Sequence, residues 1–559
     1  MDMSTPAVTT TKPYIQGAMI TQTKISGHIV DVHGRRIFKG VVCISDGIIT
    51  SIKETDQVTD QFILPGFIDS HIHIESSMVT PFEFAKTALS HGTVATVSDP
   101  HEIANVCGME GINFMITSSR SAGIKFFFGA PSCVPATSFE TSGAVISSAD
   151  IDILLSSDQI LYLSEMMNYP GVLHKDPEVM AKIHAAVKRG KPIDGHAPGL
   201  RGEEAKKYID TGISTDHECT TLEEAMDKIK HGMKIIIREG SAAKNFEVLH
   251  PLIGKHPDKV MFCSDDKHPD DLLKGHINSL VIRALHLGYD LFDVLQIACI
   301  NPIKHYSLPV GSLRVGDKAD FIIVSDTREW AVTHTYIDGV LRFCNGESYI
   351  HKTEQVLPNH FRAGEILAGS LKVPASMMPT PVIQSIDGSL ITEKKEHSLK
   401  VSDGYLQPDY DQDVLKVCVL NRYQPDSTPA LGFISGFGLK GCAIASTVAH
   451  DSHNIIAVGD QDALIARAIN LLVVSKGGLA AVSQDEERHI ALPIAGLMSD
   501  LSVREVGEMY ESITSFVKSH GCTLHAPFMT LSFMALLVIP KIKISDLGMF
   551  DAESFTFYN

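Results

Sequence analysis

The chain has 559 residues, which is too long for a single hydrophobic core, so we expect two or three domains. Its formal net charge of -18 argues against a surface that binds nucleic acid or anionic lipid and favours a small-molecule substrate. The 10 cysteines include no Cys-x-x-Cys pair and no apolar run reaches membrane-spanning length, so we expect a soluble, cytoplasmic protein without a disulfide framework.

The N-terminal region, residues 1–65, combines a polar tail with an alternating pattern. From about Lys24 to Leu64 apolar residues alternate with polar ones, and glycines at 34, 40 and 47 mark turns. This pattern predicts short strands that form the first part of a small β-sandwich.

Residues 66–310 show short apolar runs that alternate with helical segments, such as residues 81–89 and 177–184. Such alternation is typical of parallel βα units, so we predict an α/β fold, a (β/α)8 TIM-like barrel of about 250 residues. Residues 311–346 return to turn-and-strand character, and we expect them to complete the β-sandwich.

Residues 347–390 carry several prolines and little periodicity, so we predict a linker or crossing segment. Residues 391–559 resume with a strand at 415–420 and a helix around 460–474, which indicates a C-terminal α+β domain. Within it, Gly436–Gly441 fits the dinucleotide pattern Gly-x-Gly-x-x-Gly, but a strand-like run comes next instead of a helix, so we discard that match.

The segment from Leu64 to Ser77 contains His71 and His73. On a strand, residues two apart leave by the same face, and the carboxyl end of a barrel strand opens onto the active site. An isolated pair of this kind often serves only as hydrogen-bond partners near a loop. Further candidate ligands at other strand ends favour a metal site instead.

Four later apolar runs each end in a potential metal ligand. Because the strands are parallel, these ends meet at one face of the barrel. Four imidazoles with two carboxylates make a nitrogen and oxygen set that is able to hold two divalent ions. The residues are Glu165, His196, His217 and Asp265, which join His71 and His73.

This ligand set predicts metal-assisted hydrolysis. If Glu165 spans both ions, a water between them loses its proton near neutral pH and becomes a nucleophile. Asp265 lies in reach of that water, and we expect it to accept the proton and deliver it to a leaving nitrogen.

The ligands belong to a wider set of motifs at residues 64–77, 98–106, 164–168, 298–302, 316–320 and 449–454. These motifs resemble those of the amidohydrolase superfamily, in which a β-sandwich flanks a metal-loaded (β/α)8 barrel. More narrowly, the chain is similar to the bacterial adenine deaminases. The resemblance implies hydrolysis of adenine to hypoxanthine and ammonia, in purine salvage and adenine catabolism, with two Mn²⁺ ions; Fe²⁺ and Zn²⁺ are the alternatives.

The resemblance also implies roles for individual residues. His71, His73 and Asp265 would hold one ion and His196 and His217 the other, with Glu165 in place of the carboxylated lysine that bridges the ions in many relatives. That replacement argues against the cyclic-amide hydrolases. Glu102 is a candidate acid that assists protonation of the purine ring; its alternative role is a charge at a helix N-terminus.

Several other polar residues are candidates for contacts with the purine. Each has a plainer alternative: a satisfied loop histidine, a helix N-cap with neighbouring charges, or a turn held by side-chain hydrogen bonds. For the cluster at 450–453 we also consider another bound ion. The candidates are His101, Arg238, Glu239, Ser241, His450, Asp451 and His453.

Three functions remain in competition. The first is an adenine deaminase, the second a related hydrolase of another amino-heterocycle or cyclic amide, and the third a non-catalytic scaffold. Glu165 and the C-terminal domain argue against the second, and the complete ligand set argues against the third. We expect adenine as the partner, no nucleic acid, no membrane, and a homodimer or a larger homo-oligomer.

Overall fold

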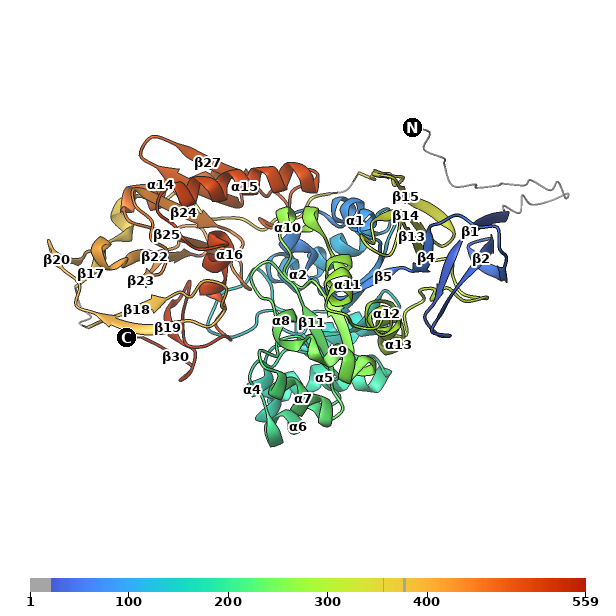
Figure 1. Ribbon diagram of the computed structural model, residues 1–559. Coiled ribbons are helices and arrows are strands. Elements are labelled where there is room, and N and C mark those ends of the chain that lie inside the picture. Colours follow the sequence, from blue (N-terminus) through green and yellow to red (C-terminus); the bar gives the residue numbers. More distant parts are fainter. Residues whose placement is uncertain (1–21, 355, 376–378, 559) are drawn as a thin grey trace.

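The computed structural model describes residues 22–354, 356–375 and 379–558 (Figure 1). The polar tail predicted at the N-terminus falls in residues 1–21, which lie outside the described residues. The C-terminal strands and helices, orange to red, form one half of the molecule, and the earlier elements form the other. Among the described residues, no helix has the length and apolar character needed to span a membrane.

The chain before and after the central region combines in one 8-stranded sheet. Its order is β16-β15-β14-β13-β4-β1-β2-β3, and β4 pairs with β13, with Pro65 opposite Phe321. Phe321 packs in a local apolar core with Ile29 and Val42. The strands are β1 (Gln22–Asp31), β2 (Arg36–Ser45), β3 (Ile48–Glu54), β4 (Phe62–Pro65), β13 (Phe321–Val324), β14 (Val332–Ile337), β15 (Val340–Cys344) and β16 (Glu347–Ser348).

The central region has parallel strands in a 5-stranded and a 3-stranded sheet. Strand β10 contacts β9, and a parallel bridge between Ile72 and Asp265 brings the first strand beside the segment after the last one, so the sheet is curled. The strands are β5 (Phe67–Ile72), β6 (Thr93–Ser98), β7 (Lys125–Ala130), β8 (Ile160–Met166), β9 (Ile193–Gly195), β10 (Thr215–Asp216), β11 (Lys234–Arg238) and β12 (Val260–Cys263).

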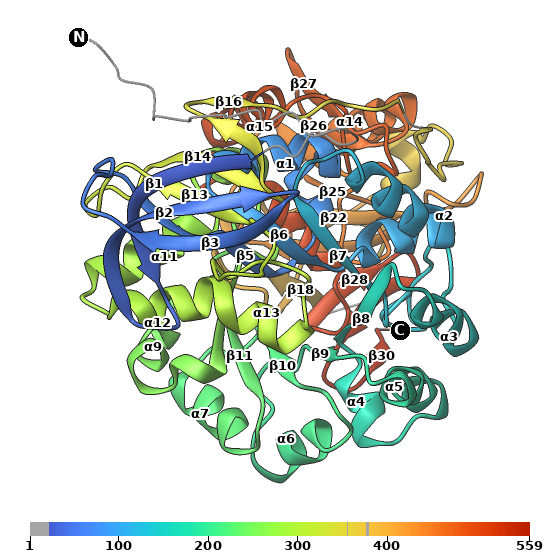
Figure 2. The same cartoon turned by 90° about the vertical axis from the view of Figure 1, so that its right-hand side faces the viewer.

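Helices come after these strands, and in Figure 2 α5, α6 and α7 lie outside β9, β10 and β11. The predicted α/β class is therefore confirmed as a mixed fold with a curled parallel sheet. The helices are α1 (Pro81–Ser90), α2 (His101–Ser119), α3 (Ser148–Ser156), α4 (Tyr169–Leu173), α5 (Pro177–Arg189), α6 (Gly202–Ile209), α7 (Leu222–Lys230), α8 (Phe246–Leu249), α9 (Pro251–Lys255), α10 (Pro269–Lys274), α11 (Ile277–His286), α12 (Leu291–Leu295) and α13 (Asn301–Tyr306).

Local sequence signals set the ends of helix α5. The side chain of Asp176 accepts hydrogen bonds from the backbone N–H groups of Glu178 and Val179, and Pro177 occupies the first turn, where no N–H is needed. Gly190 ends the helix with a φ of 63°, a conformation that glycine adopts without steric cost. These signals turn the chain back so that the next strand runs parallel to the previous one.

The C-terminal domain is built on a second 8-stranded sheet, in the order β19-β18-β23-β22-β25-β24-β26-β27. The helix expected around 460–474 is α14. The elements are β18 (Thr380–Gln384), β19 (Glu393–His397), β22 (Leu415–Leu420), β23 (Ala430–Ser435), β24 (Cys442–Ser446), β25 (Ile455–Gly459), α14 (Asp462–Ser475), β26 (Gly478–Ser483), β27 (Glu487–Ala491), α15 (Val503–Ser519) and α16 (Pro527–Ser532).

Short strands complete this domain. Strands β28, β29 and β30 form one 3-stranded sheet, and β17, β21 and β20 form another. Their bounds are β17 (Val373–Pro374), β20 (Val401–Ser402), β21 (Tyr405–Leu406), β28 (Ile542–Ser545), β29 (Gly548–Asp551) and β30 (Thr556–Phe557).

Strand β18 lies inside the segment that the sequence pattern predicts as a linker. The sequence pattern does not predict this strand because of Pro381, since proline has no N–H and is disfavoured inside sheets. In the structure Pro381 is opposite Glu396 of the edge strand β19, while the pairing of β18 with β23 begins one residue later, at Val382. The proline therefore sits where the inner strand needs no hydrogen-bond donor from it.

Candidate metal centre

The predicted ligands converge at the carboxyl ends of the parallel strands. His71 lies on β5 and Glu165 on β8, and the others lie one or two residues past the ends of their strands. All are buried. We call the following six residues the metal-centre cluster: His71, His73, Glu165, His196, His217 and Asp265.

Glu165 stands at the middle of the cluster. Its Oε1 lies 3.2 Å from Nε2 of His73 and 3.7 Å from Nε2 of His71. Its Oε2 lies 2.6 Å from Nδ1 of His196 and 3.4 Å from Nε2 of His217. Each carboxylate oxygen thus faces a different pair of imidazoles.

Asp265 closes the side of the cluster near β5. Its Oδ1 lies 3.2 Å from Nε2 of His73 and 3.5 Å from Nε2 of His71. The backbone of Asp265 has a φ of 51°, and its N–H donates to the carbonyl oxygen of His71 at 3.0 Å. This local backbone turn aims the carboxylate at both histidines.

The buried side chain of Arg238 binds the carboxylate of Asp265. Nη1 of Arg238 donates to Oδ2 of Asp265 at 2.6 Å, and the guanidinium also bonds both oxygens of Glu218, with Nη2 to Oε2 at 2.9 Å. Arg238 is therefore occupied by carboxylates. Glu218, which is the residue directly after His217, was not among the residues singled out from the sequence.

Burial and the neighbouring cations oppose each other at the two acids of the cluster. Burial raises the pKa of Glu165, but the imidazoles of His196, His217 and His73 outweigh it and hold that pKa well below its ordinary value. Burial also raises the pKa of Asp265, and Arg238 with the neighbouring histidines reverses the shift. Both side chains are therefore carboxylates at neutral pH.

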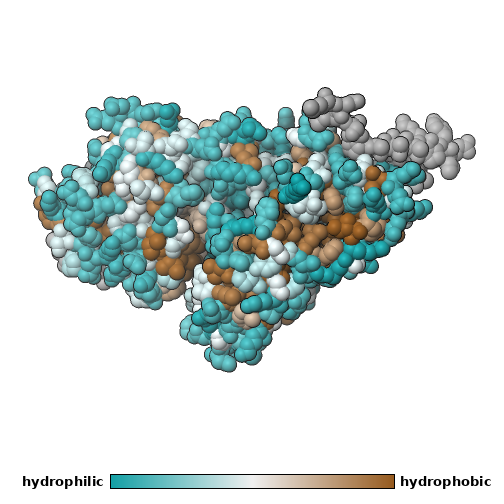
Figure 3. Space-filling view, in the orientation of Figure 1, coloured by the Kyte–Doolittle hydropathy of each residue, from teal (hydrophilic) through white to brown (hydrophobic). Residues whose placement is uncertain are grey.

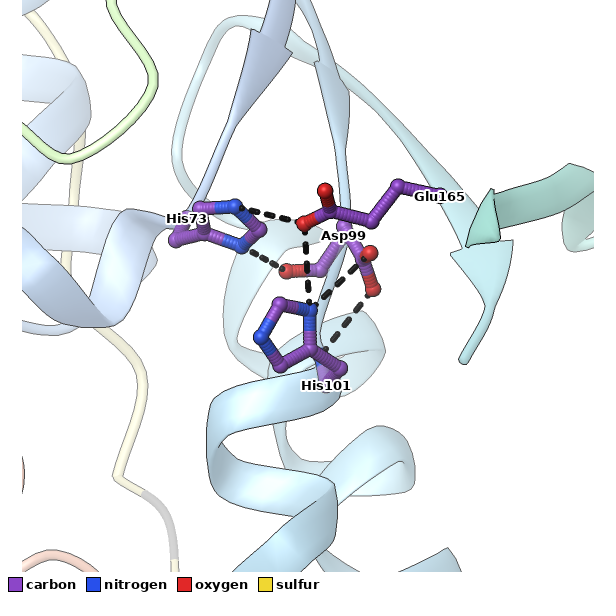
Figure 4. A group of neighbouring side chains, drawn as sticks. All are labelled: His73, Asp99, His101 and Glu165. Atoms are coloured by element: carbon purple, nitrogen blue, oxygen red, sulfur yellow. Dashed lines mark hydrogen bonds and ion pairs between the residues drawn. The ribbon is translucent and has the colours of Figure 1, made fainter. Parts of the chain in front are cut away.

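His101 lies beside the cluster (Figure 4). Its Nδ1 lies 3.0 Å from Oδ2 of Asp99 and 3.6 Å from Oε1 of Glu165. The carbonyl oxygen of Asp99 accepts from Nδ1 of His73 at 3.2 Å. Asp99 thus orients both imidazoles. It lies in the motif at residues 98–106, but the sequence does not predict it as a site residue.

The C-terminal domain reaches this face through the cluster at 450–453. Glu102 accepts from Nδ1 of His450 at 2.6 Å and from Nε2 of His453. Oδ1 of Asp451 lies 3.9 Å from Nε2 of His101, and its Oδ2 has no hydrogen-bond partner among the described residues. The residues at 450–453 therefore lie beside His101 and Glu102, although hundreds of positions separate the two groups in the sequence.

The side chains of Glu239 and Ser241 do not reach the metal-centre cluster. Oε2 of Glu239 lies 3.2 Å from Arg283. The hydroxyl of Ser241 donates to Asp271 at 2.7 Å and accepts from the backbone N–H of His268. Both residues come just after the end of β11, but their side chains turn away from the cluster.

A cavity of about 30 Å³ lies between the cluster and the C-terminal domain. Besides members of the cluster, it is lined by His101, Glu102, Met167, Glu218, Arg238, Asp266, Leu390, His450, Asp451, Phe533 and Leu536. Leu390, Phe533 and Leu536 form its apolar wall. Their spacing in the sequence carries no signal that places them at the site.

Comparison with known proteins identifies the family. The amidohydrolase family model matches residues 62–342, and the adenine deaminase C-terminal domain model matches residues 389–556. An adenine deaminase from Salinibacter ruber is 51% identical over 534 residues, which cover 95% of this chain and 98% of that relative. The chain belongs to the adenine deaminase family. Another member, from Sulfurovum sp., is 52% identical over 96% of this chain and 99% of its own.

Among solved structures, a beta-aspartyl dipeptidase from Fervidobacterium islandicum AW-1 is similar, with 19% identity and a TM-score of 0.45. The similarity covers 59% of this chain and 98% of that one.

Membership of the amidohydrolase family implies a divalent metal, and the cluster suits one. Nε2 of His71 and Nε2 of His73 lie 3.2 Å apart and face each other, an arrangement that a shared cation stabilises. Nδ1 of His73 is used by the carbonyl of Asp99, which leaves Nε2 free to donate its lone pair. The oxygens of Glu165 complete a donor set that suits borderline divalent ions.

Proposed function

We propose that this protein is an adenine deaminase that hydrolyses adenine to hypoxanthine and ammonia. The observation that carries the proposal is the position of Glu165, whose two oxygens each face a different pair of imidazoles. Relatives named adenine deaminase, about half identical over nearly the whole chain, support the choice of substrate.

We assign the cluster to two divalent ions. His71, His73 and Asp265 would hold one and His196 and His217 the other, with Glu165 shared between them. Manganese is our first choice, and iron or zinc would also fit nitrogen and oxygen ligands. When bound, the ions supply an acidified water as the nucleophile and a positive charge beside the reacting carbon.

Asp265 moves the proton in this proposal. Its Oδ1 faces the histidines, while its Oδ2 is held by Arg238 at 2.6 Å, so the carboxylate cannot rotate away. It takes a proton from the attacking water and passes it to the amino group, which leaves C6 of the purine as ammonia. Arg238 acts through Asp265 as a positioning residue.

We place the purine beside His101, His450 and Asp451, which line the cavity together with the cluster. Oδ2 of Asp451 is buried without a partner among the described residues, so it is available to accept an N–H of the free base. His453 acts through Glu102. Glu239 and Ser241 do not enter this proposal, because their side chains bond elsewhere.

We also propose the finer points of the architecture. The curled parallel sheet over residues 66–310 would close as a (β/α)8 barrel, and the described part of the N-terminal segment, residues 22–65, would form the flanking β-sandwich with residues 311–346. Residues 391–559, together with strand β18, would be the C-terminal domain, and the rest of residues 347–390 would be the crossing segment. The amidohydrolase match ends at residue 342, before that segment, and the C-terminal domain match begins at residue 389, at its end, which supports this division.

A cytoplasmic role in purine salvage and a homo-oligomeric state complete the proposal. All 10 cysteines are free thiols, as suits a reducing compartment. The face in Figure 3 is mainly hydrophilic with scattered apolar patches. Exposed apolar side chains on the neighbouring helices α3 and α5, Ile153 and Val187, suit a contact between copies. Light scattering after size-exclusion chromatography measures the number of copies.

The activity is tested with manganese-loaded protein and adenine. Ammonia release should match the hypoxanthine that forms. Asp265→Asn should abolish turnover because it removes the proton acceptor, and His73→Ala should abolish it because it removes a predicted ligand. Lys440→Ala, at the exposed turn of the C-terminal domain, is the control. Absence of hypoxanthine with fully loaded wild-type protein would overturn the proposed function.

A further inference from the structure

Glu102 has both carboxylate oxygens committed to histidines of the C-terminal domain. Oε1 accepts from Nδ1 of His450 at 2.6 Å, and Oε2 accepts from Nε2 of His453. All three side chains are buried. A carboxylate that accepts two such bonds is held in its ionised form, so Glu102 is poorly suited to donate a proton itself.

The tautomer of His453 fixes its role. The backbone N–H of Ala449 donates to Nδ1 of His453 at 3.2 Å, so Nδ1 carries no hydrogen. Nε2 must then carry the hydrogen that His453 donates to Glu102. The same assignment makes a metal ion at Glu102, His450 and His453 unfavourable, because both nitrogens of His453 already serve hydrogen bonds.

His450 is held differently, because only one of its nitrogens is used. Nδ1 is the donor to Glu102, and Nε2 has no hydrogen-bond partner among the described residues. The ring stacks on Phe533, with centroids 4.6 Å apart and planes at 13°, and both residues line the cavity that the cluster faces. Nε2 is therefore the nitrogen that remains available to a ligand.

We propose that His450 is the acid that protonates the purine ring nitrogen N1 while water attacks C6. This inference rests on the proposed function and names a catalytic residue for it. It assigns the acid role to His450, with Glu102 as the carboxylate that orients it.

The charges around His450 support this role. Burial lowers the pKa of His450, but Glu102 and the more distant Asp266 and Asp451 raise it to about 9, so the ring is an imidazolium at neutral pH. Burial lowers the pKa of His453 to about 4 and leaves that ring neutral. The positive charge of the pair therefore resides on the ring with the free nitrogen.

The protons balance over one turnover. As the water oxygen bonds to C6, the π electrons of the C6–N1 bond move to N1, and N1 takes the proton from Nε2 of His450. Asp265 takes one proton of the water. The second water proton, on the new hydroxyl, returns to the neutral His450 as the C6 carbonyl forms. The proton on Asp265 leaves with the amino group as ammonia, and N1 keeps its hydrogen in hypoxanthine.

The test compares two variants of the manganese-loaded, full-length protein. His450→Asn keeps an N–H near the position of Nδ1, so the bond to Glu102 survives while the acid is lost. His450→Ala opens space for added imidazole. We expect kcat to fall by about 10²- to 10⁴-fold in both, the range for loss of a general acid, with metal content unchanged.

Chemical rescue separates an acid from a structural residue. Imidazole should restore turnover to His450→Ala, and among imidazoles of similar size the rescued rate should vary with imidazolium acidity. Imidazole should leave His360→Asn, a variant of an exposed histidine paired with Glu110, unaffected. Full activity of His450→Asn, or no rescue of a folded and metal-loaded His450→Ala, would overturn this inference. Inactive wild-type protein would instead overturn the proposed function.

Discussion

Oε1 of Glu102 lies 2.6 Å from Nδ1 of His450, a residue 348 positions later in the chain. This contact ties the N-terminal end of α2 to the loop after β24, and it joins the C-terminal domain to the same cavity as the metal-centre cluster. The cavity beside the metal-centre cluster is therefore lined by both halves of the chain.

Replacement of the shared carboxylate tests the two-ion assignment. In Glu165→Gln an amide nitrogen takes the place of one anionic oxygen. His71 and His73 keep Asp265, whereas the carboxylate left near His196 and His217 is Glu218, at 3.6 Å from both rings and bound by Arg238. We expect metal content to fall by about one ion per chain, since each ion needs an anionic ligand. Atomic absorption after dialysis measures it, with Glu178→Gln at the surface as the control. Unchanged content in Glu165→Gln would contradict the shared role.

Arg238 is expected to matter for stability as well as for activity. Arg238→Met leaves the carboxylates of Asp265 and Glu218 buried without their partner, which should lower the free energy of unfolding by about 3 to 5 kcal/mol in urea titrations.

The double variant Arg238→Met with Glu218→Gln should recover part of that loss, because one of the two unpaired charges is removed. Arg467→Met is the matched control. It breaks an exposed pair with Glu487, and such pairs contribute at most about 1 kcal/mol. Equal losses in Arg238→Met and Arg467→Met would refute this account of the buried arginine.

Lys543 predicts a pH dependence of stability. It is fully buried and donates to the carbonyl oxygens of Leu390 and Phe533 at 2.7 and 3.0 Å. Burial lowers its pKa to about 7, against about 10.4 in an unfolded chain. The cost of burying the charge is therefore full below pH 7 and disappears as the pH rises toward 10.4.

The wild type should gain stability over Lys543→Met between pH 7 and 10, by up to about 1.4 kcal/mol per pH unit. Urea unfolding of both proteins across this range measures the difference, in which other titrating groups cancel. A difference that does not change with pH would show that Lys543 titrates normally.

The cavity is too small for the proposed substrate as it stands. A volume of about 30 Å³ holds about two waters, whereas ligand pockets usually exceed about 300 Å³. The wall from the C-terminal domain, with Leu390 and Phe533, must therefore move to admit a purine. We expect hydrogen exchange at residues 533–543 to slow when hypoxanthine is bound, while β26 stays unchanged. Equal protection with and without hypoxanthine would contradict a moving wall.

The metal-centre cluster could be predicted from the sequence because its members share one property. Each lies at the end of a short apolar run, and parallel strands bring such ends to a common face. The direction of a side chain beyond the strand end is less predictable. Asp265 points inward from a left-handed backbone conformation, and Ser241 turns outward to Asp271. Glu218 was missed because only its neighbour His217 stood at the strand end.

Contacts between the two halves of the chain could not be predicted from local patterns. The polar cluster at 450–453 was recognised, but its contact with Glu102 depends on how the C-terminal domain packs against α2. Phe533 and Leu390 are ordinary apolar residues, and only the tertiary structure brings them to the cavity. Strand β18 was missed because the sheet tolerates Pro381 at a position that needs no donor.

Anomalous diffraction from crystals of the manganese-loaded protein tests the central claim most directly. We predict two peaks per chain: one among His71, His73 and Asp265, the other between His196 and His217, with Glu165 reaching both. A single peak, or peaks away from Glu165, would contradict the two-ion assignment.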